Sequence, residues 1–188
     1  MGAADEYRDS IASYILTNFE SHGLQVYTEV PMGKTVIGKN RRVDVLALRP
    51  TDQVALGIEC KLQDSRGTTD EKIWYALSDL EAMWIPGVLV YTGDGWSPGV
   101  MHTLQGSKLA ADCRPDKSLQ RTRHTLELDY VLASVFGLWD LVLDPKRRFH
   151  RVEASQLKLP PAPTARVKSK PAKKPAKKPA KKTAPAER

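Results

Sequence analysis

The stretch VALGIECKLQ, residues 54–63, places three polar side chains at alternate positions of an otherwise apolar run. Glu59, Lys61 and Gln63 lie two residues apart, and side chains with that spacing fall on one face of a β-strand. Charged groups are costly to bury unless they are paired or used in chemistry. We therefore expect a strand over residues 54–62 that carries a functional cluster on one face.

The segments around this strand predict an alternation of helices and strands. The predicted strands cover residues 24–30, 43–48, 54–62 and 87–93, with 33–42 a short strand or a loop. The predicted helices cover residues 5–21, 98–110 and 129–143, and a further helix begins at the capping box Thr68-x-x-Glu71 and turns Ile73, Leu77, Leu80 and Trp84 toward the core. The order helix, three strands, helix, strand, helix predicts an α/β fold with a mixed sheet flanked by helices.

The composition of the chain is that of a globular protein rather than of a membrane or secreted protein. Of 188 residues, 41% are hydrophobic and 27% charged, which is typical of a soluble globular chain. No apolar run approaches the ~20 residues of a membrane span, and the acidic start MGAADEYRDS does not resemble a secretory signal. Cys60 and Cys113 form no CxxC pair, which indicates a reducing, cytoplasmic environment, and the four histidines lack the spacing of a zinc site.

The basic character of the chain is concentrated at its end. Residues 165–188 hold ten Lys or Arg and one Glu, whereas residues 1–164 hold 19 bases and 21 acids. Three PAKK units place Pro at every fourth position and leave nothing apolar to bury, which predicts disorder. We therefore expect a folded domain over 1–159 and a disordered basic tail over 160–188.

The tail resembles the Lys/Ala/Pro tails of linker histones and of some bacterial nucleoid proteins. Such tails bind nucleic acid through release of counterions, and in a bacterium this would associate the chain with the nucleoid. A solubility tail is the alternative, although an acidic run would serve that purpose better. The lysines predicted to contact nucleic acid there are Lys173, Lys174, Lys177, Lys178, Lys181 and Lys182.

Two acids on neighbouring strands predict a metal site. Fourteen residues separate Asp44 from Glu59, enough for two strand halves and the turn at 49–53. Adjacent antiparallel strands would bring the two carboxylates together, where they repel unless a cation neutralises them. Mg²⁺ favours one or two carboxylates, with water and phosphate oxygens completing its shell, and Mn²⁺ is a possible substitute. Lys61 could activate the attacking water or offset charge that develops on phosphorus.

The pair VDVLAL…GIECKLQ resembles the core motif of the PD-(D/E)XK nuclease superfamily, which has a restriction-endonuclease-like fold. The family builds an α-β-β-β-α-β core in which an Asp begins the motif and (D/E)-x-K follows on the next strand, a pattern that Asp44, Glu59 and Lys61 match. The similarity covers roughly residues 4–93. The one departure is Val43, where the signature has Pro.

The same resemblance suggests further site residues. Glu6 occupies the place of a helix Glu that belongs to the site in some branches, and Gln63 matches a Gln found two residues past the Lys. Lys72, near the start of a helix, could meet a phosphate. The backbone carbonyl of Cys60, between Glu59 and Lys61, could bind the metal.

Plainer interpretations stay open for several residues. Glu59 and Lys61 could form an ion pair on a solvated face, but the flanking apolar residues favour a sheet covered on both sides. Glu6 could simply suit the helix dipole, Gln63 could be strand-end polarity, and Glu29 is best explained as an exposed edge acid. The four tryptophans are expected to be mostly core, with Trp96 the candidate for base stacking. Four bases before the Asp44 strand are either a solvated rim or a grip on phosphates: Lys34, Lys39, Arg41 and Arg42.

These observations favour a Mg²⁺-dependent DNA nuclease held on DNA by its tail, and the resemblance in its core favours an endonuclease. Cutting both strands with one such site would need a homodimer. The alternatives are a catalytically inactive DNA-binding protein on the same fold and a nuclease that acts on RNA or a nucleotide.

Overall fold

The computed structural model describes residues 2–65, 70–153 and 156–158. The chain divides into two compact units, Met1–Arg148 and Phe149–Arg188, and all the helices and strands given below belong to the first. The predicted boundary at 159–160 and the basic tail fall outside the described residues, as does Thr68 of the predicted capping box. No helix of the described residues is long and apolar enough to cross a membrane.

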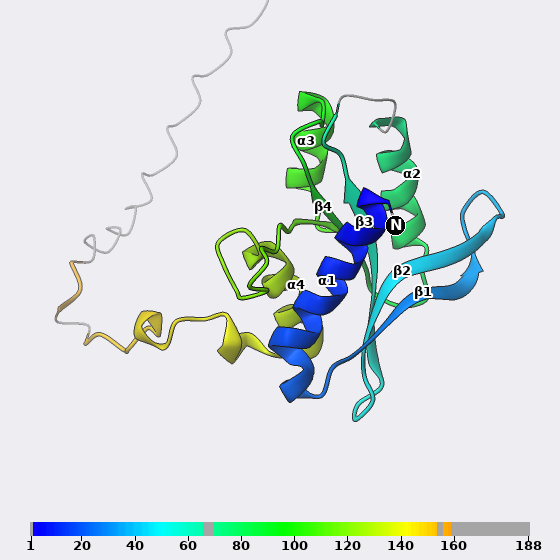
Figure 1. Ribbon diagram of the computed structural model, residues 1–188. Helices are drawn as coiled ribbons and strands as arrows, with labels where there is room; N and C mark the ends of the chain where they lie inside the picture. The colour runs from blue at the N-terminus through cyan, green and yellow to red at the C-terminus, as the bar shows by residue number, and fades with distance from the viewer. Residues whose placement is uncertain (1, 66–69, 154–155, 159–188) are drawn as a thin grey trace, which may run out of the picture. The chain divides into compact units, whose positions relative to one another are not determined.

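The predicted order of elements is confirmed, with one short strand added (Figure 1). In chain order the elements are α1 (Ala3–Phe19), β1 (Gln25–Lys34), β2 (Asn40–Arg49), β3 (Val54–Leu62), α2 (Asp70–Glu81), β4 (Gly87–Thr92), α3 (Pro98–Gly106), β5 (Ala110–Asp112) and α4 (Leu126–Phe136). The helix predicted over 98–110 ends at Gly106, and its last predicted residue begins β5 instead. A strand of three residues is too short to show an alternating pattern.

The five strands form one mixed sheet in the order β1-β2-β3-β4-β5. The first three strands are antiparallel, and β3, β4 and β5 are parallel. Parallel neighbours need a crossover between them, and α2 provides it between β3 and β4. The α/β fold with a mixed sheet and flanking helices, expected from the sequence, is therefore confirmed.

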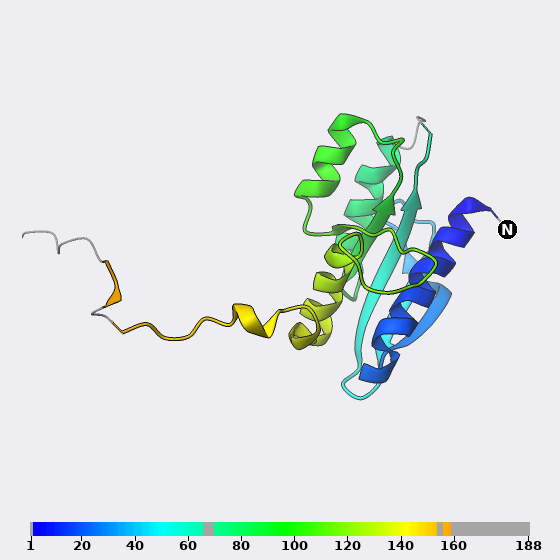
Figure 2. The same cartoon turned by 60° about the vertical axis from the view of Figure 1, so that its left-hand side comes forward.

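Helices cover both faces of the sheet (Figure 2). On one face α1 and α4 pack on side chains such as Val45, Ile58 and Val90, which are inaccessible to solvent. On the other face α2 and α3 pack on Leu89 and Tyr91. Neighbouring residues of β4 thus enter different core layers, as the alternation of a strand requires.

Two predicted boundaries differ from the structure for local reasons. The first strand does not end at Pro31 but pairs Pro31 with Arg42 and runs on to Lys34. An edge strand tolerates proline, whose missing N–H faces away from the sheet. The helix predicted over 129–143 begins earlier and ends at Phe136, because Gly137 adopts a left-handed φ of 66°.

The tryptophans correct the expectation that most of them are core. Trp84 lies beyond the end of α2 and is 83% exposed, and Trp74 and Trp139 are also exposed. Trp96 is buried, and its indole N–H donates to the Thr92 carbonyl at 3.1 Å. The predicted stripe of α2 thus holds for Ile73 and Leu80 but fails at Trp84.

Candidate active site

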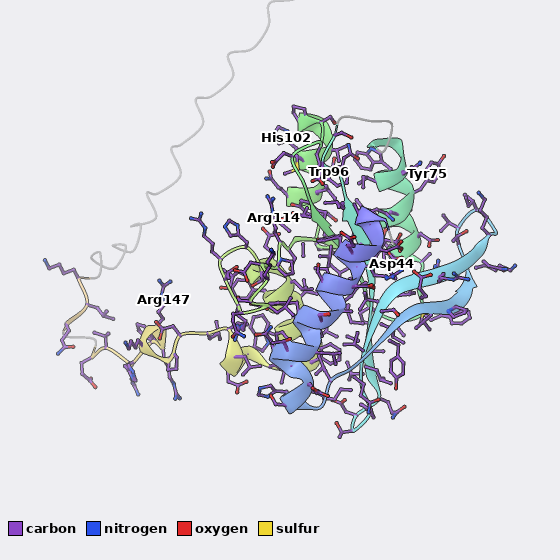
Figure 3. The ribbon with its side chains drawn as sticks, viewed as in Figure 1. Asp44, Tyr75, Trp96, His102, Arg114 and Arg147 are labelled. Carbon is purple, nitrogen blue, oxygen red and sulfur yellow. The ribbon has the colours of Figure 1, made fainter. Side chains whose placement is uncertain are left out.

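The site lies where β2 and β3 separate. Their ladder ends at the pair Val45 and Ile58, and beyond it β2 continues with β1 alone. The next residue on each strand is an acid, Asp44 on β2 (Figure 3) and Glu59 on β3, and both are half-buried. We call this place the fork.

Asp44 is held toward β3 by a backbone contact. Its Oδ2 accepts the N–H of Cys60 at 2.8 Å, a donor that lies just past the end of the β2–β3 ladder. A buried amide without a hydrogen-bond partner is costly, so the carboxylate supplies the acceptor that the Cys60 N–H needs. The same hydrogen bond fixes the position of the Asp44 side chain. This contact explains why an acid is tolerated between Val43 and Val45.

Glu59 and Lys61 lie on one face of β3, as their spacing predicts. The Lys61 ammonium donates to Glu59 Oε1 at 2.5 Å, with the two side chains 29% and 27% exposed. Their partners on β4 are Leu89 and Tyr91, so both point toward the α2–α3 side of the sheet.

The electrostatics of the fork favour a cation. Burial raises the pKa of Glu59, and the Asp44 charge raises it further, against the opposing effect of Lys61. Burial likewise raises the pKa of Asp44, while the Cys60 N–H and Lys61 act to lower it. Burial alone would lower the pKa of Lys61, but the Glu59 charge and hydrogen bond bring it above its ordinary value. Two carboxylates therefore share one ammonium in a place poor in water.

The oxygen donors at the fork suit a hard divalent ion. Gly57 and Gln63 donate their backbone N–H groups toward β4, so by alternation the backbone of Cys60 faces the side of Asp44. Its carbonyl can join the two carboxylates as a third oxygen. Within the described residues no three His, Cys, Asp or Glu side chains gather as a metal cluster. Two carboxylates and one carbonyl would leave the rest of a divalent ion's shell to water or phosphate oxygens.

A cleft reaches the fork at Glu59. It has a volume of about 300 Å³ and is lined also by Arg42, Val43 and, from α2, Asp79, but not by Asp44 or Lys61. A larger cavity of about 700 Å³ lies at the ends of β4 and β5, with Asp112 and Arg114 in its wall (Figure 3). None of the fork side chains lines that larger cavity, and we place no chemistry in it.

Glu6 does not join the fork. It is exposed on α1 and lines a hollow together with Pro115, Asp116 and Lys117. The α1 side chain whose charge acts on Asp44 is Arg8, two residues further along. An assisting role for Glu6 stays a prediction.

Glu29 is the acid that the sequence argument set aside. It lies in β1 opposite Asp44, between the pairs Thr28–Val45 and Val30–Val43, and its charge raises the pKa of Asp44. It accepts hydrogen bonds from Arg8 at 2.7 Å and Arg42 at 3.1 Å. Its φ of 57° is uncommon for a residue other than Gly, and such strain persists where surrounding contacts impose it, often near functional sites. The sequence carries no signal for this conformation.

Gln63 connects the end of β3 to the turn after β4. It is buried, and its amide N–H donates to the Gly95 carbonyl at 3.0 Å. Its Oε1 is buried without a hydrogen-bond partner in the described chain. The contact with Gly95 gives Gln63 a structural task, and its predicted catalytic role is untested.

The predicted nucleic-acid contacts fall into three groups. Lys34, Lys39, Arg42 and Lys72 are exposed. Arg41 is buried and forms two hydrogen bonds of 2.8 Å with the carboxylate of Asp79, so its charge is used inside the protein. The lysines of the tail lie outside the described residues.

Comparison with known proteins gives the family. No curated protein matches the chain. The crystal structure of a protein of unknown function, AF1548, matches with 17% identity and a TM-score of 0.35 over 53% of each chain, so this chain spans about half of that protein. A family model described as a PD-(D/E)XK nuclease superfamily domain matches residues 3–139. That match covers the sheet, the fork and the helices on both faces, and the chain therefore belongs to the PD-(D/E)XK nuclease superfamily.

Proposed function

We propose that this protein is a Mg²⁺-dependent DNA endonuclease that hydrolyses phosphodiester bonds at the fork. The observation that carries the proposal is that Asp44, Glu59 and Lys61 lie near one another where β2 and β3 separate, with a cleft beside Glu59. Membership of a nuclease superfamily supports the reaction class. The choice of DNA and of Mg²⁺ rests on the chemistry of the residues.

Asp44, Glu59 and the Cys60 carbonyl would hold the metal ion. When bound, the ion polarises a phosphate oxygen and lowers the pKa of a bound water. Among the described residues, the Lys61 ammonium supplies the only positive charge within hydrogen-bond distance of Glu59. The carboxylates, whose pKa values are raised by burial, ionise more readily once a cation is present.

Lys61 is suited to stabilise charge rather than to accept a proton. The Glu59 charge and hydrogen bond raise its pKa against the opposing effect of burial, which favours the ammonium form that donates hydrogen bonds. Hydrolysis adds the oxygen of water to phosphorus and breaks one P–O ester bond, and negative charge spreads over the phosphoryl oxygens on the way. The Lys61 ammonium, which lies on Glu59, can donate to those oxygens as the charge develops.

A plasmid assay tests the proposal. Supercoiled plasmid incubated with the full chain and Mg²⁺ or Mn²⁺ is expected to yield nicked circles before linear DNA, because one such site cuts one strand at a time. EDTA should abolish the cutting. Gel electrophoresis over time measures both products, with the same protein lacking added metal as the control. Binding to plasmid without nicking in either metal would instead support an inactive DNA-binding protein.

The tail is expected to supply affinity rather than chemistry. If about half of its ten cations engage phosphates, deleting residues 165–188 makes the slope of log K against log salt shallower by roughly four to five. Fluorescence anisotropy on a labelled duplex measures the slope. A chain of full length with the six PAKK lysines changed to Gln keeps four tail cations, so its slope should become shallower by roughly three. Loss of cutting at saturating DNA would contradict a purely tethering role.

A further inference from the structure

Beyond the fork, β1 and β2 continue as a two-stranded arm, which we define as residues 30–43. Figure 1 shows this ribbon reaching past the other strands. Its tip is an ordered turn, in which the Thr35 N–H donates to the Lys39 carbonyl at 2.8 Å and the Gly38 N–H to the Thr35 carbonyl at 2.9 Å. The arm therefore begins next to Asp44 and ends in a hydrogen-bonded turn.

The tip of the arm exposes two apolar side chains between basic ones. Val36 is 51% and Ile37 59% exposed, and turns of this kind are more often built from Gly, Asn or Asp. Lys34 and Lys39 flank them and are exposed as well. The whole arm, VPMGKTVIGKNRRV, contains four bases and no acid, but Arg41 is paired with Asp79 and Arg42 with Glu29. The surface of its tip thus combines the positive charges of Lys34 and Lys39 with two apolar side chains that lie about half exposed.

The arm is fixed in place by α2 and the segment after it. Asp79 accepts the backbone N–H of Val36 at 2.8 Å and also both hydrogen bonds from Arg41. On the other strand, the ring of Trp84 lies against Gly33, where an added Cβ would come within 3.2 Å of it. The exposed tip is therefore held rigidly, and the largely exposed indole of Trp84 lies beside it.

The arm and the fork share one cleft. The cavity beside Glu59 is lined near the tip by Thr35 and Asn40, so it runs along the underside of the arm. Asn40, where β2 leaves the turn, lies four strand positions from Asp44, which spans about 13 Å at the rise of a strand, or about four base pairs of duplex.

We propose that the arm distorts DNA: Val36 and Ile37 enter between base steps as a wedge, Lys34 and Lys39 hold the flanking phosphates, and Trp84 stacks on an exposed base. Apolar wedges flanked by cations are how many proteins kink and unstack duplexes, and base–aromatic stacking tolerates any sequence. The preferred substrate class is then duplex with weakened stacking, such as a mismatch or bulge near the cut. A second copy of this chain is a poorer occupant, because the exposed Lys34 and Lys39 of two tips would repel each other. This inference rests on the proposed function in taking DNA as the ligand.

The test measures binding without cutting. Full-length chain carrying Asp44→Asn is titrated in EDTA with a matched duplex and with the same duplex carrying one mismatch beside a 2-aminopurine. We expect about tenfold tighter binding to the mismatched duplex and a rise in 2-aminopurine fluorescence, since a wedge costs less where stacking is already weak. Adding Val36→Ser and Ile37→Ser should remove both effects. Leu143→Ser, which changes another half-exposed apolar residue, should remove neither.

Each other outcome has a distinct meaning. An unchanged preference in the double variant overturns the wedge, whether or not the wild-type protein cuts DNA. A change in sedimentation of the double variant, with the DNA preference intact, identifies the tip as a contact between copies and also overturns it. The wild-type protein could fail to nick plasmid while its preference for mismatched DNA still depends on the tip. That result would support the wedge and refute the nuclease proposal. Trp84→Ala should lower the fluorescence response, whereas Trp74→Ala, the other strongly exposed tryptophan next to α2's core residues, should leave it unchanged.

Discussion

Replacing Asp44 by Asn is expected to reduce plasmid nicking by about a thousandfold, because the charge that helps to hold the metal at the fork is lost while its shape is kept. Glu59→Gln should have an effect of the same order. Initial rates of nicked-circle formation in Mg²⁺ measure both. Glu20→Gln, which neutralises an exposed acid after α1, is the matched control and should cut like the wild type.

Loss of activity in Asp44→Asn should not come from loss of stability. The pKa of Asp44 is raised in the folded chain, so its ionisation opposes folding, and the stability it contributes in acid is lost as the pH rises through the folded-state pKa. Asn removes this pH-dependent effect and can still accept the Cys60 N–H. The variant should therefore be at least as stable as the wild type at pH 7, with the difference shrinking below about pH 4. Urea unfolding at the two pH values measures it, and a strongly destabilised variant at pH 7 contradicts this account.

Asp79→Ala is expected to lower the free energy of unfolding by about 3 kcal/mol, since it leaves the buried Arg41 guanidinium and the Val36 N–H without their acceptor. For a chain of this size that corresponds to a fall in Tm of about 6–12 °C. Glu81→Ala is the matched control on the same helix. Its pair with Lys108 is exposed and 3.9 Å long, and should contribute at most about 0.5 kcal/mol.

A double variant distinguishes the contribution of the ion pair to stability from the contribution of side-chain packing. Arg41→Met with Asp79→Leu removes both charges and should recover much of the stability lost in Asp79→Ala. It should not restore the fixed position of the tip, because the acceptor of the Val36 N–H is still missing. The preference for mismatched DNA is then expected to stay weak. Equal stabilities of Asp79→Ala and Glu81→Ala would show that the contacts of Asp79 with Arg41 and with the Val36 N–H contribute little to stability.

The sequence was sufficient for the elements and for the polar face of β3. Alternation over VALGIECKLQ and the apolar spacing of the first helix are local patterns, and each depends on residues a few positions apart. The spacing of Glu59 and Lys61 needed only the geometry of a single strand, and the structure joins the two side chains. The boundaries at Pro31 and Phe136 were missed because an edge position and a left-handed glycine decide them.

What the sequence by itself determined is therefore the order of helices and strands apart from β5, and the presence of an acid–base motif on two of the strands. Only the tertiary structure decided that β2 separates from β3 at Asp44 and that Glu29 rather than Glu6 lies opposite that acid. It also decided that Arg41 forms an ion pair with Asp79. The physical reason is distance along the chain: Arg41 and Asp79 are 38 residues apart, and their contact depends on how α2 packs beside the arm. Local patterns specify which face a side chain takes, and packing between elements decides what that side chain meets.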